Sequence, residues 1–191
     1  MVKVFVETYG CASNQADSEI MMGLLKANNF EIANSPIEAD VNIINTCVVK
    51  GPTEKRMIFR IKELTKLNKP LVVAGCMAKT DFDLIWKLNP KASVIVPDNV
   101  EKIVEVVKAS LYGEKLSMIE DLKKPKTSLP KYRRNPIVSI VQISRGCLMN
   151  CSYCYSPYRG KLLSYPKDEI VKQVERDVMD GCKEIWITSL D

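Results

Sequence analysis

Four short apolar runs, each followed by a segment of helical periodicity, occupy the first 111 residues. The runs at 2–7, 41–45, 71–74 and 93–96 are rich in Val and Ile, as buried strands are. After each run, apolar residues recur at spacings of three and four, which is the period of one helix face. This alternation predicts a parallel sheet with helices on both faces. Asn14 and Asp17 suggest a capped start of the first helix.

A second strand–helix–strand unit follows, with strands expected at 137–143 and 184–188. The intervening stretch is rich in Pro and Lys, which is typical of an interdomain linker. We therefore predict an amino-terminal domain at 1–115, a basic linker at 116–136 and a second domain at 137–191. Two strands and one helix cannot close a barrel or cover both faces of a sheet. The second domain is therefore expected to be incomplete.

The chain has 191 residues, seven Cys and no His. Imidazole is the commonest general base and metal ligand in proteins, so its absence excludes many kinds of active site. No apolar run is long enough to cross a membrane, and no export signal precedes the first strand. We therefore expect a cytoplasmic protein with reduced thiols. The odd number of Cys favours metal or cluster binding over a framework of disulfides.

The predicted linker carries a run of basic side chains that no acidic residue interrupts: Lys123, Lys124, Lys126, Lys131, Arg133 and Arg134. Such a run favours binding to a polyanion such as nucleic acid. A solvated linker with no ligand explains the same residues equally well.

Cys147, Cys151 and Cys154 form the most specific motif in the chain. Three thiolates on one compact loop can bind three irons of a four-iron four-sulfur cluster and leave the fourth iron open. Structural zinc would need a fourth ligand, for which Cys182 or a carboxylate would have to serve. We interpret Cys182 as a packing residue, because it matches no ligand position.

This loop, between a predicted strand and a predicted helix, resembles the radical S-adenosylmethionine (SAM) superfamily. The resemblance implies that SAM binds the open iron and yields a 5′-deoxyadenosyl radical. It places Tyr153 near the adenine of SAM, although a packing role explains an aromatic residue equally well. The end of the last predicted strand, where Ser189 lies, resembles the region that contacts the methionine end of SAM. The resemblance also implies that 137–191 is the start of an incomplete radical SAM (β/α) barrel.

Cys11, Cys47 and Cys76 each follow a predicted strand directly and precede a helix. The carboxyl ends of parallel strands lie at one edge of a sheet, where such folds bind ligands. The three thiols are therefore expected to meet there and to hold a second cluster. The alternative is that each Cys is a small buried residue, which is the usual role of an unpaired cysteine.

The sequences around these three cysteines resemble the amino-terminal domain of the methylthiotransferases, a flavodoxin-like α/β domain. The matching segments are Glu7-Thr-Tyr-Gly-Cys11-Ala-Ser-Asn14-Gln-Ala-Asp-Ser-Glu19, Asn45-Thr-Cys47 and Ala74-Gly-Cys76. Their form is similar to the archaeal and eukaryotic branch, which adds a methylthio group to carbon 2 of N6-threonylcarbamoyladenosine beside the tRNA anticodon.

The resemblance implies two 4Fe-4S clusters, SAM, tRNA as partner and an electron donor. One cluster would make the radical, and the other would carry the sulfur. Relatives that modify isopentenyl-adenosine or a ribosomal protein are alternatives within the family. A non-catalytic iron–sulfur or electron-transfer module is an alternative outside it. Since the family continues through a barrel and an RNA-binding domain, we expect this chain alone to be an incomplete and inactive enzyme.

Overall fold

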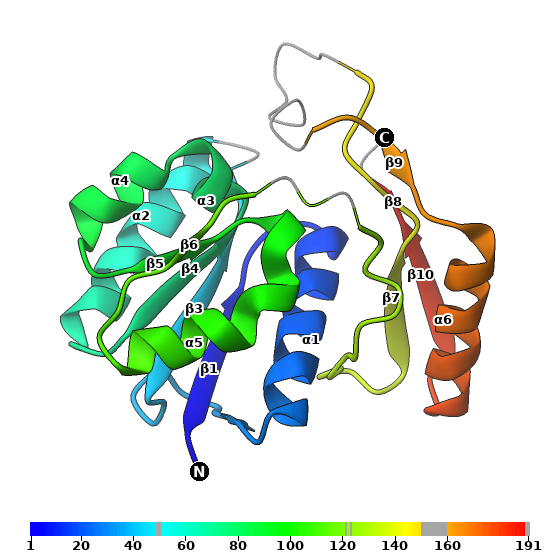
Figure 1. Cartoon of the computed structure of the whole chain (residues 1–191), viewed down its shortest axis with the longest axis horizontal. Coiled ribbons are helices and arrows are strands. Elements are labelled where there is room, and N and C mark those ends of the chain that lie inside the picture. Colours follow the sequence, from blue (N-terminus) through cyan, green and yellow to red (C-terminus); the bar gives the residue numbers. More distant parts are fainter. Residues whose placement is uncertain (49–50, 121, 123, 150–159, 190–191) are drawn as a thin grey trace.

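The computed structural model describes residues 1–48, 51–120, 122, 124–149 and 160–189. Its largest feature is a six-stranded sheet in the order β2-β1-β3-β4-β5-β6, with every neighbouring pair parallel (Figure 1). The strands are β1 (Lys3–Thr8), β2 (Glu31–Ile32), β3 (Val41–Thr46), β4 (Leu71–Gly75), β5 (Ser93–Ile95) and β6 (Ser117–Met118). The predicted α/β class and parallel sheet are therefore confirmed. The two-residue edge strands β2 and β6 were not predicted.

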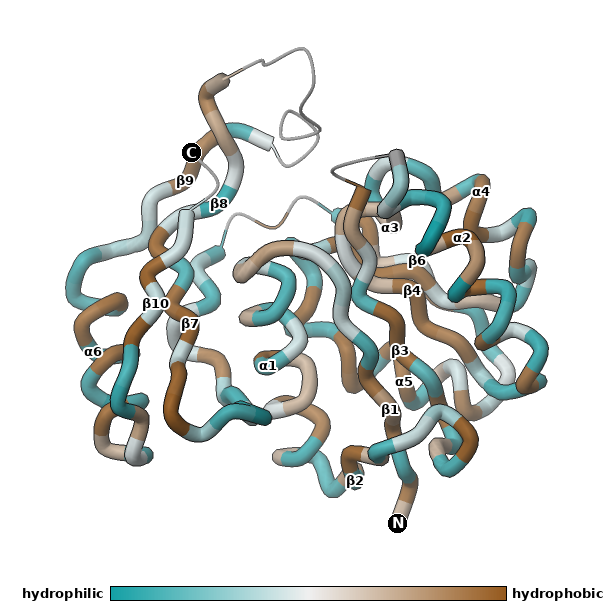
Figure 2. Tube along the Cα trace, turned by 180° about the vertical axis from the view of Figure 1, so that it is seen from behind, coloured by the Kyte–Doolittle hydropathy of each residue, from teal (hydrophilic) through white to brown (hydrophobic). Residues whose placement is uncertain are grey.

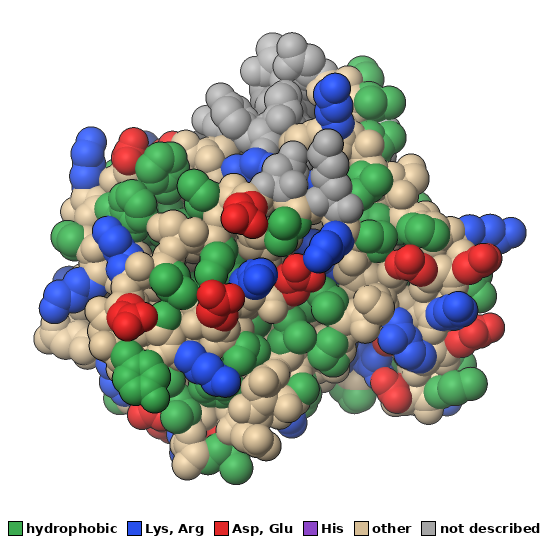
Figure 3. Space-filling model, viewed as in Figure 1, with side chains coloured by type: hydrophobic (Ala, Val, Ile, Leu, Met, Phe, Trp, Pro, Cys, Tyr) green, Lys and Arg blue, Asp and Glu red, His purple; other side chains and the backbone are tan. Residues whose placement is uncertain are grey.

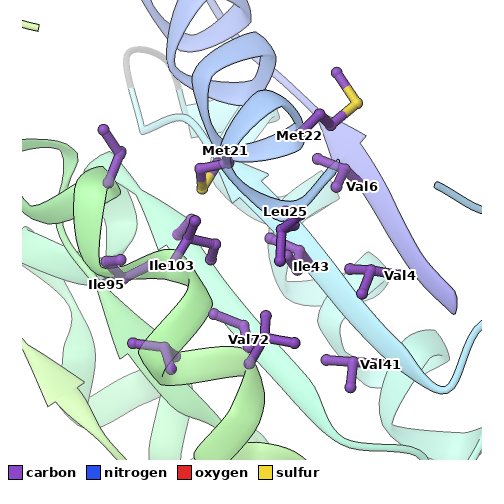
Figure 4. Close-up of a cluster of buried hydrophobic side chains, with 14 of the residues drawn as sticks. Val4, Val6, Met21, Met22, Leu25, Val41, Ile43, Val72, Ile95 and Ile103 are labelled. Atoms are coloured by element: carbon purple, nitrogen blue, oxygen red, sulfur yellow. The ribbon is translucent and has the colours of Figure 1, made fainter. Parts of the chain in front are cut away.

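Helices cover both faces of this sheet. One face packs against α1 (Ala12–Ala27) and α5 (Ile103–Leu111), and Figure 4 shows Met21 and Leu25 of α1 beside strand residue Ile43. The other face packs against α2 (Gly51–Lys66), α3 (Cys76–Thr80) and α4 (Phe82–Leu88). Because β3 lies between the two layers, all six of its residues are buried. The central strands are correspondingly apolar along much of their length (Figure 2).

A smaller unit follows the main sheet. Its strands β7 (Val138–Gln142) and β10 (Glu184–Thr188) are parallel, and α6 (Lys167–Met179) lies between them in sequence. This arrangement confirms the second predicted strand–helix–strand unit. An antiparallel pair, β8 (Ser144–Arg145) with β9 (Leu163–Ser164), extends from it. In the described parts of the chain, no helix is long and apolar enough to span a membrane.

Helix α1 lies between the main sheet and the smaller unit, since it packs on β1 and also on β7 (Figure 1). The segment expected to be a linker packs along α1. The Tyr132 amide donates to the carbonyl of Glu19 at 2.9 Å, and the Lys26 ammonium lies 4.1 Å from the centre of the Tyr132 ring. Strand β6, which also belongs to this segment, pairs with β5. The segment therefore packs on the fold along much of its length.

Four basic side chains of the predicted linker contact other parts of the fold, and three of them, Lys126, Lys131 and Arg133, are buried or partly buried, whereas Arg134 is exposed. Lys126 lies 2.6 Å from the Asp17 carboxylate, and Lys131 donates to the Ile140 carbonyl at 2.5 Å. Arg133 donates to Asp177 at 2.9 Å, and Arg134 donates to the Val6 carbonyl at 2.8 Å. Lys124 is exposed and lies 3.9 Å from Glu101, and Lys123 is outside the described residues. Figure 3 shows acidic and basic side chains intermixed on this face. The interpretation of the run as a polyanion-binding surface is therefore wrong for Lys126, Lys131 and Arg133, whose charges pair with Asp17 and Asp177.

Asp177 of α6 accepts several hydrogen bonds at the joint, meaning the contact between α1, the linker segment and the smaller unit. It is 2% exposed and accepts hydrogen bonds from Arg133 Nη1 at 2.9 Å, Ser139 Oγ at 2.5 Å and Gln173 Nε2 at 3.0 Å. A buried carboxylate is tolerated only when such partners replace its lost hydration. Asp177 thus joins the linker, β7 and α6 in one polar cluster.

The buried pair Lys126–Asp17 and the exposed pair Lys66–Glu63 both have a 2.6 Å separation, which makes them a matched comparison. Lys126→Ala leaves the Asp17 carboxylate buried without its ammonium partner, while the Gln142 amide remains at 3.1 Å. We expect a loss of about 3–5 kcal/mol in the free energy of unfolding. Lys66→Ala should cost less than about 1 kcal/mol, because water screens that pair. Urea denaturation of both variants measures this, and equal losses would contradict a structural role for the buried pair.

Glu19 makes the stability of this joint depend on pH. Burial raises the pKa of its carboxyl to about 7, although Lys131 and Arg133 oppose the shift. A raised pKa means that the folded state favours the protonated acid, so this stabilisation is complete below the ordinary value of 4.5 and is lost as the pH rises through about 7. Glu19→Gln removes the titration. We expect the stability of the parent relative to Glu19→Gln to fall between pH 5 and 7.5 in urea melts; a constant difference would show that Glu19 titrates normally.

Candidate metal centres

The three cysteines of the amino-terminal half lie at the carboxyl ends of adjacent strands. Cys11 follows β1, Cys47 follows β3 directly, and Cys76 is the first residue of α3 after β4. The parallel pairing aligns Thr8 with Asn45, and Thr46 with Gly75, so the three strands end at the same level. Gly10 precedes Cys11, and a Cβ added to Gly10 would lie 3.1 Å from the Cys47 sulfur. The predicted placement of these residues at one sheet edge agrees with this arrangement.

The Asn14 side chain contacts two of these cysteines and the backbone beside the third. Its Oδ1 lies 3.7 Å from the Cys11 sulfur and 3.9 Å from the Cys76 sulfur, so both thiols can donate to the same oxygen. Its Nδ2 donates to the carbonyls of Tyr9 at 2.9 Å and Thr46 at 2.8 Å. The expected capping role is wrong, because α1 begins at Ala12 and Asn14 is a buried residue within the first turn.

A second layer of polar contacts supports the same edge. Asn45 Nδ2 donates to the carbonyl of Asn14 at 2.8 Å and to Ser18 Oγ at 2.9 Å. Gly75 has a φ of 90°, and a Cβ there would lie 2.3 Å from Asn45 Oδ1. Only glycine fits this close approach, since any side chain would displace Asn45. The position before Cys76 is therefore constrained by the strand beside it.

The donor set at this edge has the chemistry of an iron–sulfur site, since thiolates are the usual ligands of such clusters. Within the ranges that the structure describes, no three His, Cys, Asp or Glu side chains are gathered closely enough to hold a single metal ion. A four-iron cluster makes a different demand, because each thiolate binds a separate iron. Cys11 and Cys76 both face one amide oxygen and Cys47 follows the strand between theirs, so the three thiols need not converge on a single point to serve as separate ligands.

The second predicted cluster loop is described only at its two ends. Cys147 follows β8, its amide donates to the Gly160 carbonyl at 3.3 Å, and its sulfur accepts from the Met149 amide at 3.3 Å. Cys151, Tyr153 and Cys154 lie outside the described residues. Ser189 follows β10, where its hydroxyl lies 2.6 Å from that of Ser144. Ser189 is thus at the carboxyl end of the small sheet, on the strand next to β7.

Asp98 links the two cysteine regions, and nothing in the sequence pattern indicated it. Asp98 belongs to the 3-10 helix η1 (Pro97–Lys102) that follows β5. Its Oδ1 lies 2.7 Å from Arg145 Nη1, two residues before Cys147, and its Oδ2 lies 3.3 Å from Lys79 Nζ, three residues after Cys76. The Asp98 and Arg145 side chains are 7% and 8% exposed, so this pair is buried. Cys182, as expected of a packing residue, is 3% exposed and lies in the turn between α6 and β10.

Comparisons with known proteins match both parts of the chain. Residues 3–97 match the Uncharacterized protein family UPF0004, and residues 141–191 match the Radical SAM superfamily. The chain is 39% identical to the threonylcarbamoyladenosine tRNA methylthiotransferase of Drosophila melanogaster, over 99% of this chain and 35% of that protein. It is also 39% identical to the probable threonylcarbamoyladenosine tRNA methylthiotransferase of Methanothermobacter thermautotrophicus, over 100% of this chain and 45% of that protein.

A relative from Mus musculus with the same name is 35% identical over 99% of this chain and 34% of its own length. The chain thus spans less than half the length of these relatives. The resemblance drawn from the motifs is confirmed by these matches. Two segments of the chain thus match the UPF0004 and Radical SAM family models in order, and its whole length aligns with part of relatives named threonylcarbamoyladenosine tRNA methylthiotransferase.

Proposed function

We propose that this chain is part of a tRNA methylthiotransferase that adds a methylthio group to carbon 2 of N6-threonylcarbamoyladenosine next to the anticodon. The observation that carries the proposal is the grouping of Cys11 and Cys76 around one amide oxygen, with Cys47 on the strand between theirs. Three thiols at one sheet edge supply a sulfur-rich site beside a radical SAM segment. The names of the relatives supply the substrate.

Two sets of residues would hold the metal centres. Membership of the radical SAM superfamily implies a 4Fe-4S cluster and SAM, for which Cys147, Cys151 and Cys154 are the proposed ligands. Cys11, Cys47 and Cys76 are the proposed ligands of a second 4Fe-4S cluster. When bound, these groups would supply hydrogen-atom abstraction and sulfur transfer.

The chain's own residues would position these groups. Ser189 and Tyr153 are proposed to contact SAM at its methionine and adenine ends. Asp98, through Arg145 and Lys79, holds the two cysteine regions against each other. Asn14 and Asn45 order the thiol edge by contacts within the fold. The protein thereby supplies placement, while the bound groups supply reactivity.

The partners and the domain division complete the proposal. tRNA is the proposed substrate because the relatives are named for it. The linker charges add little support, since Lys126, Lys131 and Arg133 pair with acidic residues of the fold. A reductase or another electron donor would reduce the clusters in the cytoplasm. The division into 1–115, 116–136 and 137–191 assigns one metal centre to each outer part.

Iron and sulfide counting after anaerobic reconstitution tests the proposed centres. Two four-iron clusters predict about eight irons per chain, and Cys147/Cys151/Cys154→Ala should reduce the number to about four. The converse variant, Cys11/Cys47/Cys76→Ala, should also retain about four irons. Cys182→Ala is the matched control, because its thiol is buried away from both sites and its loss should leave the count unchanged. A parent that binds about four irons and loses all of them in the first variant would remove the proposed sulfur-carrying centre.

A further inference from the structure

We propose that Asn14 is a positioning residue of the Cys11/Cys47/Cys76 site, which holds two of its thiols in the orientation needed for loading. The inference rests on the proposed function in taking this site as a cluster site. The contacts that it explains are independent of that function. No property of the sequence alone distinguishes this role from helix capping, because Asn is a common residue at both places.

The Asn14 amide is fixed on its nitrogen side. Both hydrogens of Nδ2 are used, one by the Tyr9 carbonyl at 2.9 Å and one by the Thr46 carbonyl at 2.8 Å. These acceptors belong to the chain just before Cys11 and just before Cys47. The side chain is 2% exposed, so water cannot replace either bond. A rotation of the amide would place its oxygen against two carbonyls, which is unfavourable.

The fixed amide determines where its oxygen lies. Oδ1 faces Cys11 Sγ at 3.7 Å and Cys76 Sγ at 3.9 Å, across α1 and the start of α3. One side chain therefore contacts two of the three proposed ligands and the backbone beside the third. Without this oxygen, each of the two thiols would gain rotamer freedom and lose a hydrogen-bond acceptor. Two cysteines released in this way can react with each other when an oxidant is present.

The test uses a chain in which Cys147/Cys151/Cys154→Ala removes the other site, so that iron reports on one site alone. Asn14→Ala deletes the amide, and Asn14→Asp retains an oxygen of similar shape but cannot donate to the two carbonyls. Asn89→Ala is the matched control. Asn89 is also buried, and its Nδ2 donates to Thr65 Oγ1 at 3.2 Å, but it lies between α4 and β5, at the opposite end of a strand from the cysteines.

The first measurement is the rate at which each thiol of the metal-free, folded chain reacts with a maleimide, resolved by mass spectrometry. We expect both Asn14 variants to label Cys11 and Cys76 roughly five- to tenfold faster, as expected for one or two lost hydrogen bonds. Buried Cys182 should be unaffected, which separates local release from general unfolding. Exposure to air should produce more Cys11–Cys76 disulfide in the variants than in the Asn89→Ala control.

The second measurement is iron and sulfide content after anaerobic reconstitution. The Asn14 variants should bind less than about half the iron of their background, while Asn89→Ala should bind as much as the background. Unchanged labelling and unchanged iron in both Asn14 variants would overturn the proposal. So would loss of folded structure in both, because Asn14 would then serve the fold alone. If the background binds no iron but the labelling still changes, the proposed cluster fails and the positioning role of Asn14 stands.

Discussion

The parallel pairing of β1, β3 and β4 is the constraint on which the rest of the structure depends. Its register sets Thr8 opposite Asn45 and Thr46 opposite Gly75, so the chain leaves all three strands at one level. Residues separated by 36 and 29 positions in sequence thereby become neighbours. The apolar layers on both faces hold this register, since a slip of one residue would exchange the side chains between two closely packed layers and disturb the packing of both.

A second constraint is electrostatic. The side chains of Asp17, Asp98 and Asp177 are at most 7% exposed, and each pairs with a basic residue from another part of the chain. Buried carboxylates contribute little net stability compared with apolar residues, but leaving one without its partner is costly. Such pairs consequently favour one arrangement of the joined elements over others. Here they fix α1, the segment 124–135 and the small β7–β10 sheet relative to one another.

The sequence predicts those features of the structure that depend on the local pattern of apolar residues, namely the main strands and the residues that follow them. Apolar runs identified the main strands, and the placement of Cys11, Cys47 and Cys76 after them predicted the shared edge. The role of Asn14 could not be predicted, because a capping residue and a thiol-contacting residue look alike until β3 is placed beside α1. The basic segment was misinterpreted for a related reason. Its acidic partners, Asp17 and Asp177, lie 109 and 44 positions away, and only the tertiary fold brings them together.

Asp98 shows how these two constraints combine. One carboxylate oxygen faces Lys79 in the helix that Cys76 begins, and the other faces Arg145 just before Cys147. The main sheet places Asp98 at its carboxyl edge, and charge pairing then attaches the second cysteine loop to that edge. A flexible linker would let the two regions move independently, whereas a buried ion pair relates them directly. The Asp98 pairs therefore hold the residues just before Cys147 against the helix that Cys76 begins, through side chains that the spacing of the cysteines does not reveal.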